Sequence, residues 1–254
     1  MPACRVYLIN LDRSPDRLAP LAGQLTTLSF DWVRISAVDG KTLGPPPWPD
    51  FDEPGFDRVL GKAPNANELG CYFSHIAAMR AFLVDGGDAA IILEDDARLT
   101  EQLPHIVDDL LARRDEWDLV KLAGFHRGLP TTMRALPGGH RLVTFLSLHR
   151  GSAGYLLTRR AAECYVANLL PMSLPYDHAL EKAWRFGIRM RGVLPHPILD
   201  GGYQSTIGHG RGKKPWHRRG SVLAYRLGNE FRRLFHYLFT DNAWMSIRRN
   251  RAPG

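Results

Sequence analysis

The sequence has few cysteines and no long apolar run. Its 254 residues include only Cys4, Cys71 and Cys164, which are scattered and odd in number. This argues against a disulfide framework or a cysteine metal cluster and favours reduced thiols in a cytosol. No run approaches the roughly 18 apolar residues of a membrane-spanning helix, and no basic segment near Met1 leads into a long apolar one. We therefore expect neither a spanning helix nor a signal peptide.

Most of the chain also lacks a net positive charge. Residues 1–210 carry 22 Lys or Arg against 24 Asp or Glu, a net charge of −2, whereas residues 211–254 carry 11 against 2, a net charge of +9. The body therefore lacks the basic surface of a nucleic-acid-binding domain, and we predict no nucleic-acid partner. We expect one domain over residues 1–210 and a basic tail over residues 211–254.

The apolar pattern predicts an α/β fold. Strands are expected at 5–10, 31–38, 89–93, 118–124, 141–146, 151–158 and within 188–199. Helices are expected after Ser14-Pro15 and at 68–86, 101–114, 159–170 and 177–187, with Asn67 as the cap of the helix at 68–86. The Pro-rich segment 41–66 is predicted to be a surface loop. A βαβ start favours a parallel sheet that binds ligands at the carboxyl ends of its strands.

Three adjacent carboxylates, Glu94, Asp95 and Asp96, follow the apolar run AAIIL. Like charges this close raise one another's pKa unless a cation lies among them. Carboxylate oxygens suit Mg²⁺ or Mn²⁺ that also binds a diphosphate, although acidic residues also favour the start of a helix. Strand alternation predicts that Glu94 and Asp96 point to one side and Asp95 to the other.

Eight short motifs extend this interpretation. In order they are VYLINLDRSPDR, RISAVDGKTL, ELGCYFSHIAAMRAFL, AIILEDDARL, DLVKLAG, GSAGYLLTRRAA, LPYDHAL and LPHPILDGGYQSTIG. Together they resemble glycosyltransferase family 25, whose members assemble lipopolysaccharide or galactosylate collagen. The resemblance covers about residues 5–208 and leaves out the tail. It implies a GT-A-like fold with a mixed, mainly parallel sheet, a UDP-galactose or UDP-glucose donor, inverting transfer, and Mn²⁺ or Mg²⁺.

The resemblance assigns roles to the acidic motif. It implies that Asp96 is a direct metal ligand, that Glu94 is a weaker or water-mediated ligand, and that Asp95 hydrogen-bonds the donor ribose. A late ligand is expected from His209, with His196 as the alternative, because imidazole suits Mn²⁺. Further donor contacts are expected from Gln204, Ser205 and Thr206.

Residues at the end of the first two expected strands are candidates for the nucleotide. The resemblance favours Asn10, Asp12 and Arg13, and an Arg fork suits a diphosphate. The alternative for Asp12, and for Arg17 beside it, is a place at a helix start. Asp39 is expected to accept a hydroxyl of ribose or uracil, or else to form a turn with the following glycine.

Four more positions are expected to contact the donor. Ser74 and His75 lie in the GCYFSH motif, where the alternative for the imidazole is simple packing on the helix. Lys121 interrupts an apolar strand and either offsets phosphate charge or faces solvent. Gly154 either permits close approach of the sugar or allows the sheet to pack tightly.

Inverting transfer needs a carboxylate that removes the proton of the acceptor hydroxyl. Asp177 is the candidate base, since it opens a helix on the acceptor side of the sequence order. The alternative is that it only caps that helix. Glu181, one turn later, is the second candidate.

The tail is predicted to form an amphipathic helix with an apolar face and an arginine-rich one. This pattern fits an anionic membrane surface, and the alternative is a helix that buries its apolar face on the body. The combined prediction is a cytoplasmic, membrane-associated transferase that acts on a lipopolysaccharide-type or other lipid-linked glycan. The alternative function is a carbohydrate- or nucleotide-binding module without turnover. Nucleotidyl transfer is a third, but the glycine- and lysine-rich loop it needs is missing from the sequence.

Overall fold

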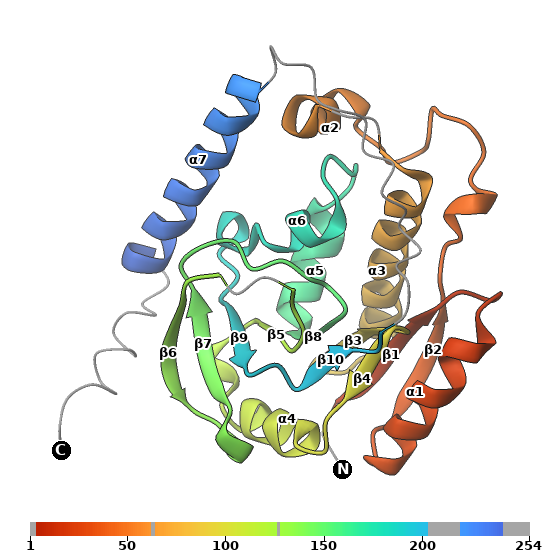
Figure 1. Cartoon of the computed structure of the whole chain (residues 1–254), viewed down its shortest axis with the longest axis vertical. Helices are drawn as coiled ribbons and strands as arrows, with labels where there is room; N and C mark the ends of the chain where they lie inside the picture. The colour runs from red at the N-terminus through yellow and green to blue at the C-terminus, as the bar shows by residue number, and fades with distance from the viewer. Residues whose placement is uncertain (1–3, 62–63, 126–127, 203–218, 241–254) are drawn as a thin grey trace.

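An eight-stranded sheet forms the centre of the protein (Figure 1). The computed structural model describes residues 4–61, 64–125, 128–202 and 219–240. The strand order is β2-β1-β3-β8-β5-β9-β7-β6, in which β8 and β7 run against the other six strands. Its strands are β1 Arg5–Asn10, β2 Trp32–Ser36, β3 Ala89–Glu94, β5 Leu119–Lys121, β6 Pro130–Ala135, β7 Arg141–Phe145, β8 Gly154–Thr158 and β9 Met190–Leu194.

Helices cover both faces of this sheet. They are α1 Pro15–Thr27, α2 Glu53–Leu60, α3 Ala66–Asp85, α4 Leu103–Ala112, α5 Arg159–Asn168, α6 Tyr176–Leu180 and α7 Arg219–Phe235. Neighbours on β1 face opposite cores: Tyr7 belongs to the cluster with α3, α5 and α6, and Leu8 to the cluster with α1 and α4. A strand buried on both faces reads as a continuous apolar run, which is why RVYLIN was recognisable. The predicted α/β class with a mixed, mainly parallel sheet is confirmed.

The Pro-rich segment holds a helix that we did not predict. Asp52 caps α2, because its side chain accepts a hydrogen bond from Gly55 N at 2.9 Å. Pro54 lies in the first turn, where no backbone N–H is needed, and Phe56 is buried beneath. The prediction of a loop throughout 41–66 was therefore wrong for this part.

Three other features differ from the prediction. Helix α3 is capped by Asn65 and not by Asn67, and Asn65 forms a reciprocal capping box with Glu68. The expected helix at 177–187 divides into α6 and a 3-10 turn, η4 (Ala183–Phe186). The late strand also divides: after β9, the strand β10 (Ile198–Asp200) pairs with β4 (Ala97–Leu99) in a separate ribbon.

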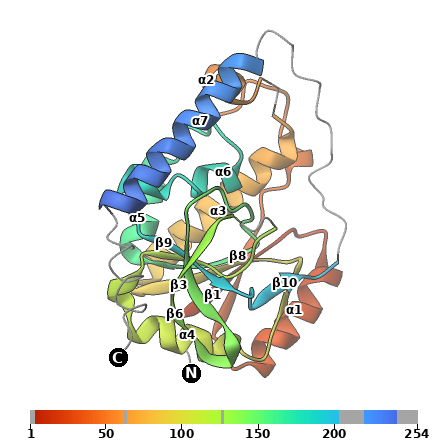
Figure 2. The same ribbon diagram turned by 60° about the vertical axis from the view of Figure 1, so that its left-hand side comes forward.

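The tail helix α7 lies against the body (Figure 2). It contacts α2 and continues into a π-helical turn, His236–Thr240. Tyr225 accepts a hydrogen bond from the Lys182 ammonium, and Arg233 is buried beside Glu181. The apolar face points away from the body, so the alternative in which docking buries that face was wrong. Among the described residues no helix has the length and hydropathy needed to span a bilayer.

Candidate active site

A polar cleft opens where β1, β2 and β3 end. Its free space, mouth included, is ≈ 580 Å³. Parallel strands commonly bind ligands at this edge of a sheet. Most of the predicted donor residues meet here, since the polar side chains on the walls are those of Asn10, Arg13, Arg17, Asp39, Asn67, Ser74, His75, Glu94 and Asp95.

Asp95 is fixed at the floor of the cleft from β1 and α1. Asn10 Nδ2 donates to Asp95 Oδ2 at 2.7 Å and also to Ser14 O at 2.9 Å. Arg17 lies 3.6 Å from the other carboxylate oxygen. Burial raises the pKa of Asp95, and the hydrogen bond from Asn10 and the charge of Arg17 oppose that rise. Asn10 thus acts by positioning the carboxylate.

Arg13 and Asp39 form a two-bonded pair across the cleft. The guanidinium donates to the carboxylate at 2.6 and 3.2 Å, and Asp39 also accepts a bond from Lys41 N at 2.9 Å. The hydrogen bond from Arg13 is the main reason why the pKa of Asp39 is lowered. Asp39 also caps the 3-10 turn η1 (Gly40–Thr42). The residue therefore both forms a turn and lines the cleft.

Ser74 holds the loop after β2 against α3. Its Oγ accepts from Val38 N at 2.8 Å and donates to Gly70 O at 2.6 Å. A Cβ on Gly70 would lie 2.5 Å from Val38 O, and a Cβ on Gly40 would lie 2.4 Å from Ala66 O. Both positions therefore need glycine for this backbone contact. Gly70 was within a quoted motif but was not singled out from the sequence.

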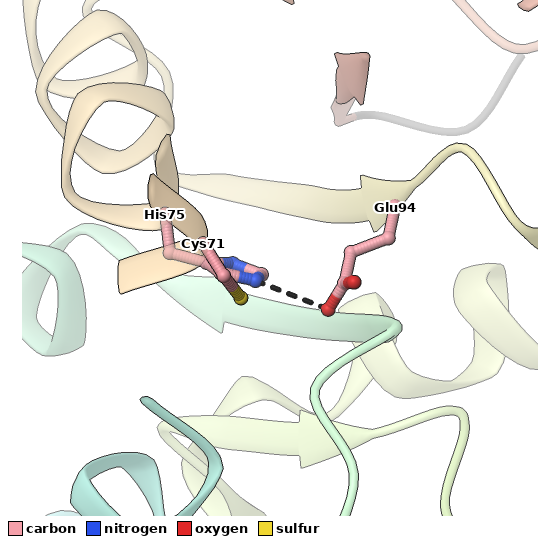
Figure 3. A group of neighbouring side chains, drawn as sticks. All are labelled: Cys71, His75 and Glu94. Atoms are coloured by element: carbon pink, nitrogen blue, oxygen red, sulfur yellow. Dashed lines mark hydrogen bonds and ion pairs between the residues drawn. The ribbon is translucent and has the colours of Figure 1, made fainter. Parts of the chain in front are cut away.

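His75 joins α3 to the acidic motif (Figure 3). Its Nε2 lies 3.2 Å from Glu94 Oε1, its Nδ1 lies 3.0 Å from the Tyr155 hydroxyl, and its ring stacks on Tyr176 at 3.9 Å. Ser152 donates to the same Glu94 oxygen at 2.9 Å. Burial alone would raise the pKa of Glu94, but His75 and Ser152 together lower it. Tyr176 was not singled out from the sequence, whereas Ser152 and Tyr155 lie in the segment around Gly154 that was considered for close approach of the sugar.

Cys71, His75 and Glu94 place their ligand atoms within 4.8 Å of one another. Burial raises the pKa of the Cys71 thiol well above its usual value, so the thiol stays protonated. A protonated thiol is a poor ligand for a hard cation such as Mg²⁺. This group is therefore better described as a hydrogen-bonded wall of the cleft than as a magnesium site.

Asp96 is the carboxylate whose surroundings best suit a cation. Its Oδ1 is buried and has no hydrogen-bond partner among the described residues. Burial, then repulsion from Glu94, Asp95 and Asp200, raises the pKa of Asp96 to about 7. The side chain lines a hollow of ≈ 470 Å³ together with His196 and Asp200. Carboxylates and imidazole are ligand types that bind Mn²⁺ or Mg²⁺, and these three side chains share the hollow without forming a group whose ligand atoms lie within 4.8 Å of one another.

The strand-alternation argument for these carboxylates does not hold. β3 ends at Glu94, and Asp95 and Asp96 lie in the turn before β4. Glu94 and Asp95 line the polar cleft, whereas Asp96 lines the neighbouring hollow. The acidic turn therefore connects two spaces. Asp200, which follows the motif LPHPIL, was not predicted.

Three predicted donor residues do not line the cleft. Asp12 is exposed and binds Arg34 and Ser36 instead. Lys121 faces neither the cleft nor solvent; its ammonium is buried against Glu181 Oε1 at 2.6 Å. Gly154 fits the second of its two predicted roles, because its lack of a side chain allows the sheet to pack tightly.

The reason for that glycine is a close contact beneath the β4–β10 ribbon. A Cβ on Gly154 would lie 2.7 Å from Ile198 Cδ1 and 3.3 Å from Leu93 Cδ1. The small residue therefore lets β10 cross over β8 and brings Asp200 near the acidic turn.

The two candidate bases have different surroundings. Asp177 is half-buried in the first turn of α6, directly after Tyr176, and its Oδ1 accepts a hydrogen bond from the N–H of its neighbour His178 at 2.9 Å. Glu181 is fully buried and tied to Lys121, which removes it as a base. The predicted contacts His209, Gln204, Ser205 and Thr206 lie outside the described residues.

The fold and site define an α/β protein with a polar cleft beside an acidic turn. The model of glycosyltransferase family 25 (LPS biosynthesis protein) matches residues 3–180, and the chain belongs to that family.

Several curated proteins are similar to this chain. Procollagen galactosyltransferase 1-A of Xenopus laevis is 28% identical over 188 residues, which is 69% of this chain and 30% of that protein. Procollagen galactosyltransferase 1 of Danio rerio is 27% identical over the same shares. A probable inactive glycosyltransferase 25 family member 3 of Rattus norvegicus is 29% identical over 46% of this chain and 22% of that protein. The chain spans less than a third of the length of these relatives.

Among solved structures, mannose-1-phosphate geranyltransferase of Thermus thermophilus aligns with a TM-score of 0.34 and 12% identity. The alignment covers 79% of this chain and 76% of that one.

Proposed function

We propose that the protein is an inverting, metal-dependent glycosyltransferase that moves a hexose from a UDP-sugar to a sugar hydroxyl of a cell-surface glycan. The observation that carries the proposal is the acidic turn, which joins a polar cleft to a hollow lined by an unpartnered carboxylate oxygen of Asp96. Galactose is the favoured hexose because relatives in the family are procollagen galactosyltransferases, with glucose as the alternative. A lipopolysaccharide-type acceptor is proposed because the family description names LPS biosynthesis.

In this proposal the cleft binds the nucleotide. Asp39 and Asp95 are held in place by Arg13 and Asn10, so they can accept hydroxyl hydrogen bonds without rearrangement. Arg17, beside Asp95, supplies positive charge for the diphosphate. Preorganised acceptors of this kind improve binding because less conformational freedom is lost.

Asp96, with Asp200 and His196 around the same hollow, would hold the cation. Bound Mn²⁺ or Mg²⁺ would offset the charge that develops on the leaving diphosphate. Glu94 lies on the opposite side of the turn, where its Oε1 is already hydrogen-bonded to His75 and Ser152. Glu94 therefore fits the role of a ligand that contacts the cation through water.

Asp177 would take the proton of the acceptor hydroxyl. It directly follows Tyr176, whose ring stacks on His75 of the cleft wall, and this neighbourhood supports the choice of Asp177 as the base. In the reaction the acceptor oxygen bonds to the anomeric carbon as the bond to the diphosphate oxygen breaks, and the proton passes to Asp177. The scattered free thiols favour a cytoplasmic enzyme.

A non-catalytic binding module is the second candidate. One observation favours it: relatives of similar identity are described as inactive members of the family. Such a module would keep the cleft of Arg13 and Asp39 but would not need Asp177.

The decisive experiment measures donor binding and hydrolysis. Purified protein with Mn²⁺ is screened against UDP-galactose, UDP-glucose, UDP-N-acetylglucosamine, a GDP-sugar and a CMP-sugar, beside Asp96→Ala and Asp177→Asn. We expect metal-dependent binding of one UDP-sugar that Asp96→Ala abolishes and Asp177→Asn retains, while hydrolysis of that sugar, in which water takes the place of the acceptor, falls by about 10²–10⁴-fold in Asp177→Asn. Binding without any turnover would favour the module, and folded protein that binds no donor would contradict both.

A further inference from the structure

Helix α7 and its π-helical turn expose one continuous apolar stripe. It consists of Leu223, Leu227, Phe231, Leu234, Phe235, Leu238 and Phe239. These residues follow one another at helical spacing, so they share a face. The exposed fractions run from 38% for Leu234 to 71% for Phe231, which is unusual for large apolar side chains. Contiguous exposed apolar surface of this kind marks an interaction site.

The opposite edge of α7 explains why the stripe faces outward. Val222, Arg233 and Tyr237 are buried on the body, and Arg233 lies 3.5 Å from Glu181 Oε2. A basic residue is thus buried while phenylalanines are exposed, the reverse of the usual preference. Glu181, which also pairs with Lys121, favours this orientation, because the buried Arg233 would lose its ion pair with Glu181 if α7 rotated.

The stripe has basic surroundings. Arg232 is exposed beside Phe231, and Trp184 of η4 shares an open hollow with Phe231 and Phe235. Arg185, also exposed, follows Trp184. The tail sequence, residues 211–254, has a net charge of +9, whereas the body has −2. Apolar side chains with aromatic and arginine neighbours match a bilayer whose headgroups are anionic.

We propose that the apolar stripe of α7 inserts into the interface of an anionic lipid bilayer, while the body stays above it. The charge of the tail selects this occupant over a neutral protein surface, because it complements anionic headgroups and would repel a second copy. The inference concerns membrane attachment and does not require that the donor chemistry proposed above is correct.

The attachment also orients the acceptor side. Tyr225 and Asn229 of α7 line a groove of ≈ 760 Å³ together with His178, the residue after Asp177. This groove lies between the body-facing side of α7 and the body, and no residue of the stripe lines it. If the proposed function holds, it is placed to receive the sugar portion of a lipid-anchored acceptor.

The test is sedimentation of the full chain with sucrose-loaded vesicles. The vesicles contain phosphatidylcholine alone or with about one third phosphatidylglycerol, a mixture that gives a negative surface. A triple variant, Leu227→Ser/Phe231→Ser/Phe235→Ser, is compared with Val84→Ser, which removes an exposed apolar residue of α3 outside the stripe. We expect the parent and Val84→Ser to bind anionic vesicles and the triple variant to bind at least about tenfold more weakly.

Two outcomes would overturn the proposal. One is equal vesicle binding by the parent and by the triple variant when both are shown to be folded by circular dichroism. The other is self-association of the parent that the same three substitutions abolish in the absence of lipid, since the stripe would then be an interface between copies. A loss of binding on Arg232→Gln, or at about 0.5 M salt, would support the electrostatic part. None of these measurements depends on donor turnover, so failure here leaves the proposed function untouched.

Discussion

Lys121 Nζ lies 2.6 Å from Glu181 Oε1, and both side chains are fully buried. Arg233 of α7 reaches the other carboxylate oxygen of Glu181 at 3.5 Å. A strand at the centre of the sheet, the α6 region and the tail helix are therefore tied to one buried anion. Breaking such a group leaves charges without a counterion in a dry environment.

Replacing one partner of this group should destabilise the fold severely. We expect Glu181→Leu to lower the free energy of unfolding by about 3–5 kcal/mol, because Lys121 and Arg233 then lose their shared partner. The double variant Lys121→Met/Glu181→Leu should recover part of that loss. Urea unfolding monitored by circular dichroism measures both, and a single variant as stable as the parent would contradict the arrangement.

The substitution Asp96→Asn separates metal binding from stability. The pKa of about 7 shows that ionised Asp96 is disfavoured in the folded protein, so the neutral amide should raise the melting temperature of metal-free protein at pH 8 by a few degrees. The same variant should lose the further rise that Mn²⁺ produces in the parent. The exposed Asp88→Asn is the matched control. An undiminished effect of Mn²⁺ on Asp96→Asn would place the cation elsewhere.

Gly70→Ala tests the contact between α3 and the loop that carries Asp39. The added methyl would lie 2.5 Å from Val38 O, a backbone atom, so the loop must move. We expect UDP affinity to fall by about tenfold, since displaced acceptors no longer match the nucleotide. Gly23→Ala in α1 meets nothing within 4 Å and should leave affinity unchanged while stabilising the helix by about 0.4–1 kcal/mol. Calorimetric titration with UDP compares the two.

Asp118 predicts a defined pH dependence of stability. Burial would raise its pKa, but hydrogen bonds from the side chain and backbone of Arg189, with Arg160, lower it below the ordinary value. The ionised Asp118 therefore contributes fully to the free energy of unfolding above the pKa of about 3.9 that it has in the unfolded chain. This contribution is lost as the pH falls through the lower pKa of the folded protein.

Asp118→Asn should consequently be less stable than the parent by about 1–3 kcal/mol at pH 7, because Arg189 and Arg160 lose a charged acceptor. The difference between the two proteins should shrink below about pH 4, where the parent carboxylate also becomes neutral. Urea unfolding at several pH values measures this difference in the free energy of unfolding. A difference that does not change with pH would mean that charge is not the cause.

Much of the fold was predictable, because the strands buried on both faces appear as apolar runs and the apolar residues of the main helices recur at helical spacing. The α2 helix was missed because its Pro-rich surroundings hid the cap at Asp52 and the two buried residues Phe56 and Leu60. The order of strands in the sheet was not predictable, since β8 inserts antiparallel between β3 and β5 through contacts far apart in sequence.

The site was predicted unevenly for a similar reason. Asn10, Arg13, Asp39 and Asp95 meet in one cleft because each lies at or shortly after the carboxyl end of β1, β2 or β3, and His75 reaches the same cleft from α3. Lys121 could not be placed from its sequence, since its counterion Glu181 is 60 residues away. Asp200 was missed because only the β4–β10 ribbon brings it beside Asp96.

The burial of Arg233 changes how the chain should be divided for experiments. A fragment that stops at residue 210 contains every predicted catalytic residue, and it would be the natural choice for crystallisation. Such a fragment also removes a cation that neutralises Glu181, four residues after Asp177. Its loss of activity would then report a loosened acceptor side and not a missing anchor, so the tail is better studied by substitution on its outer face than by truncation.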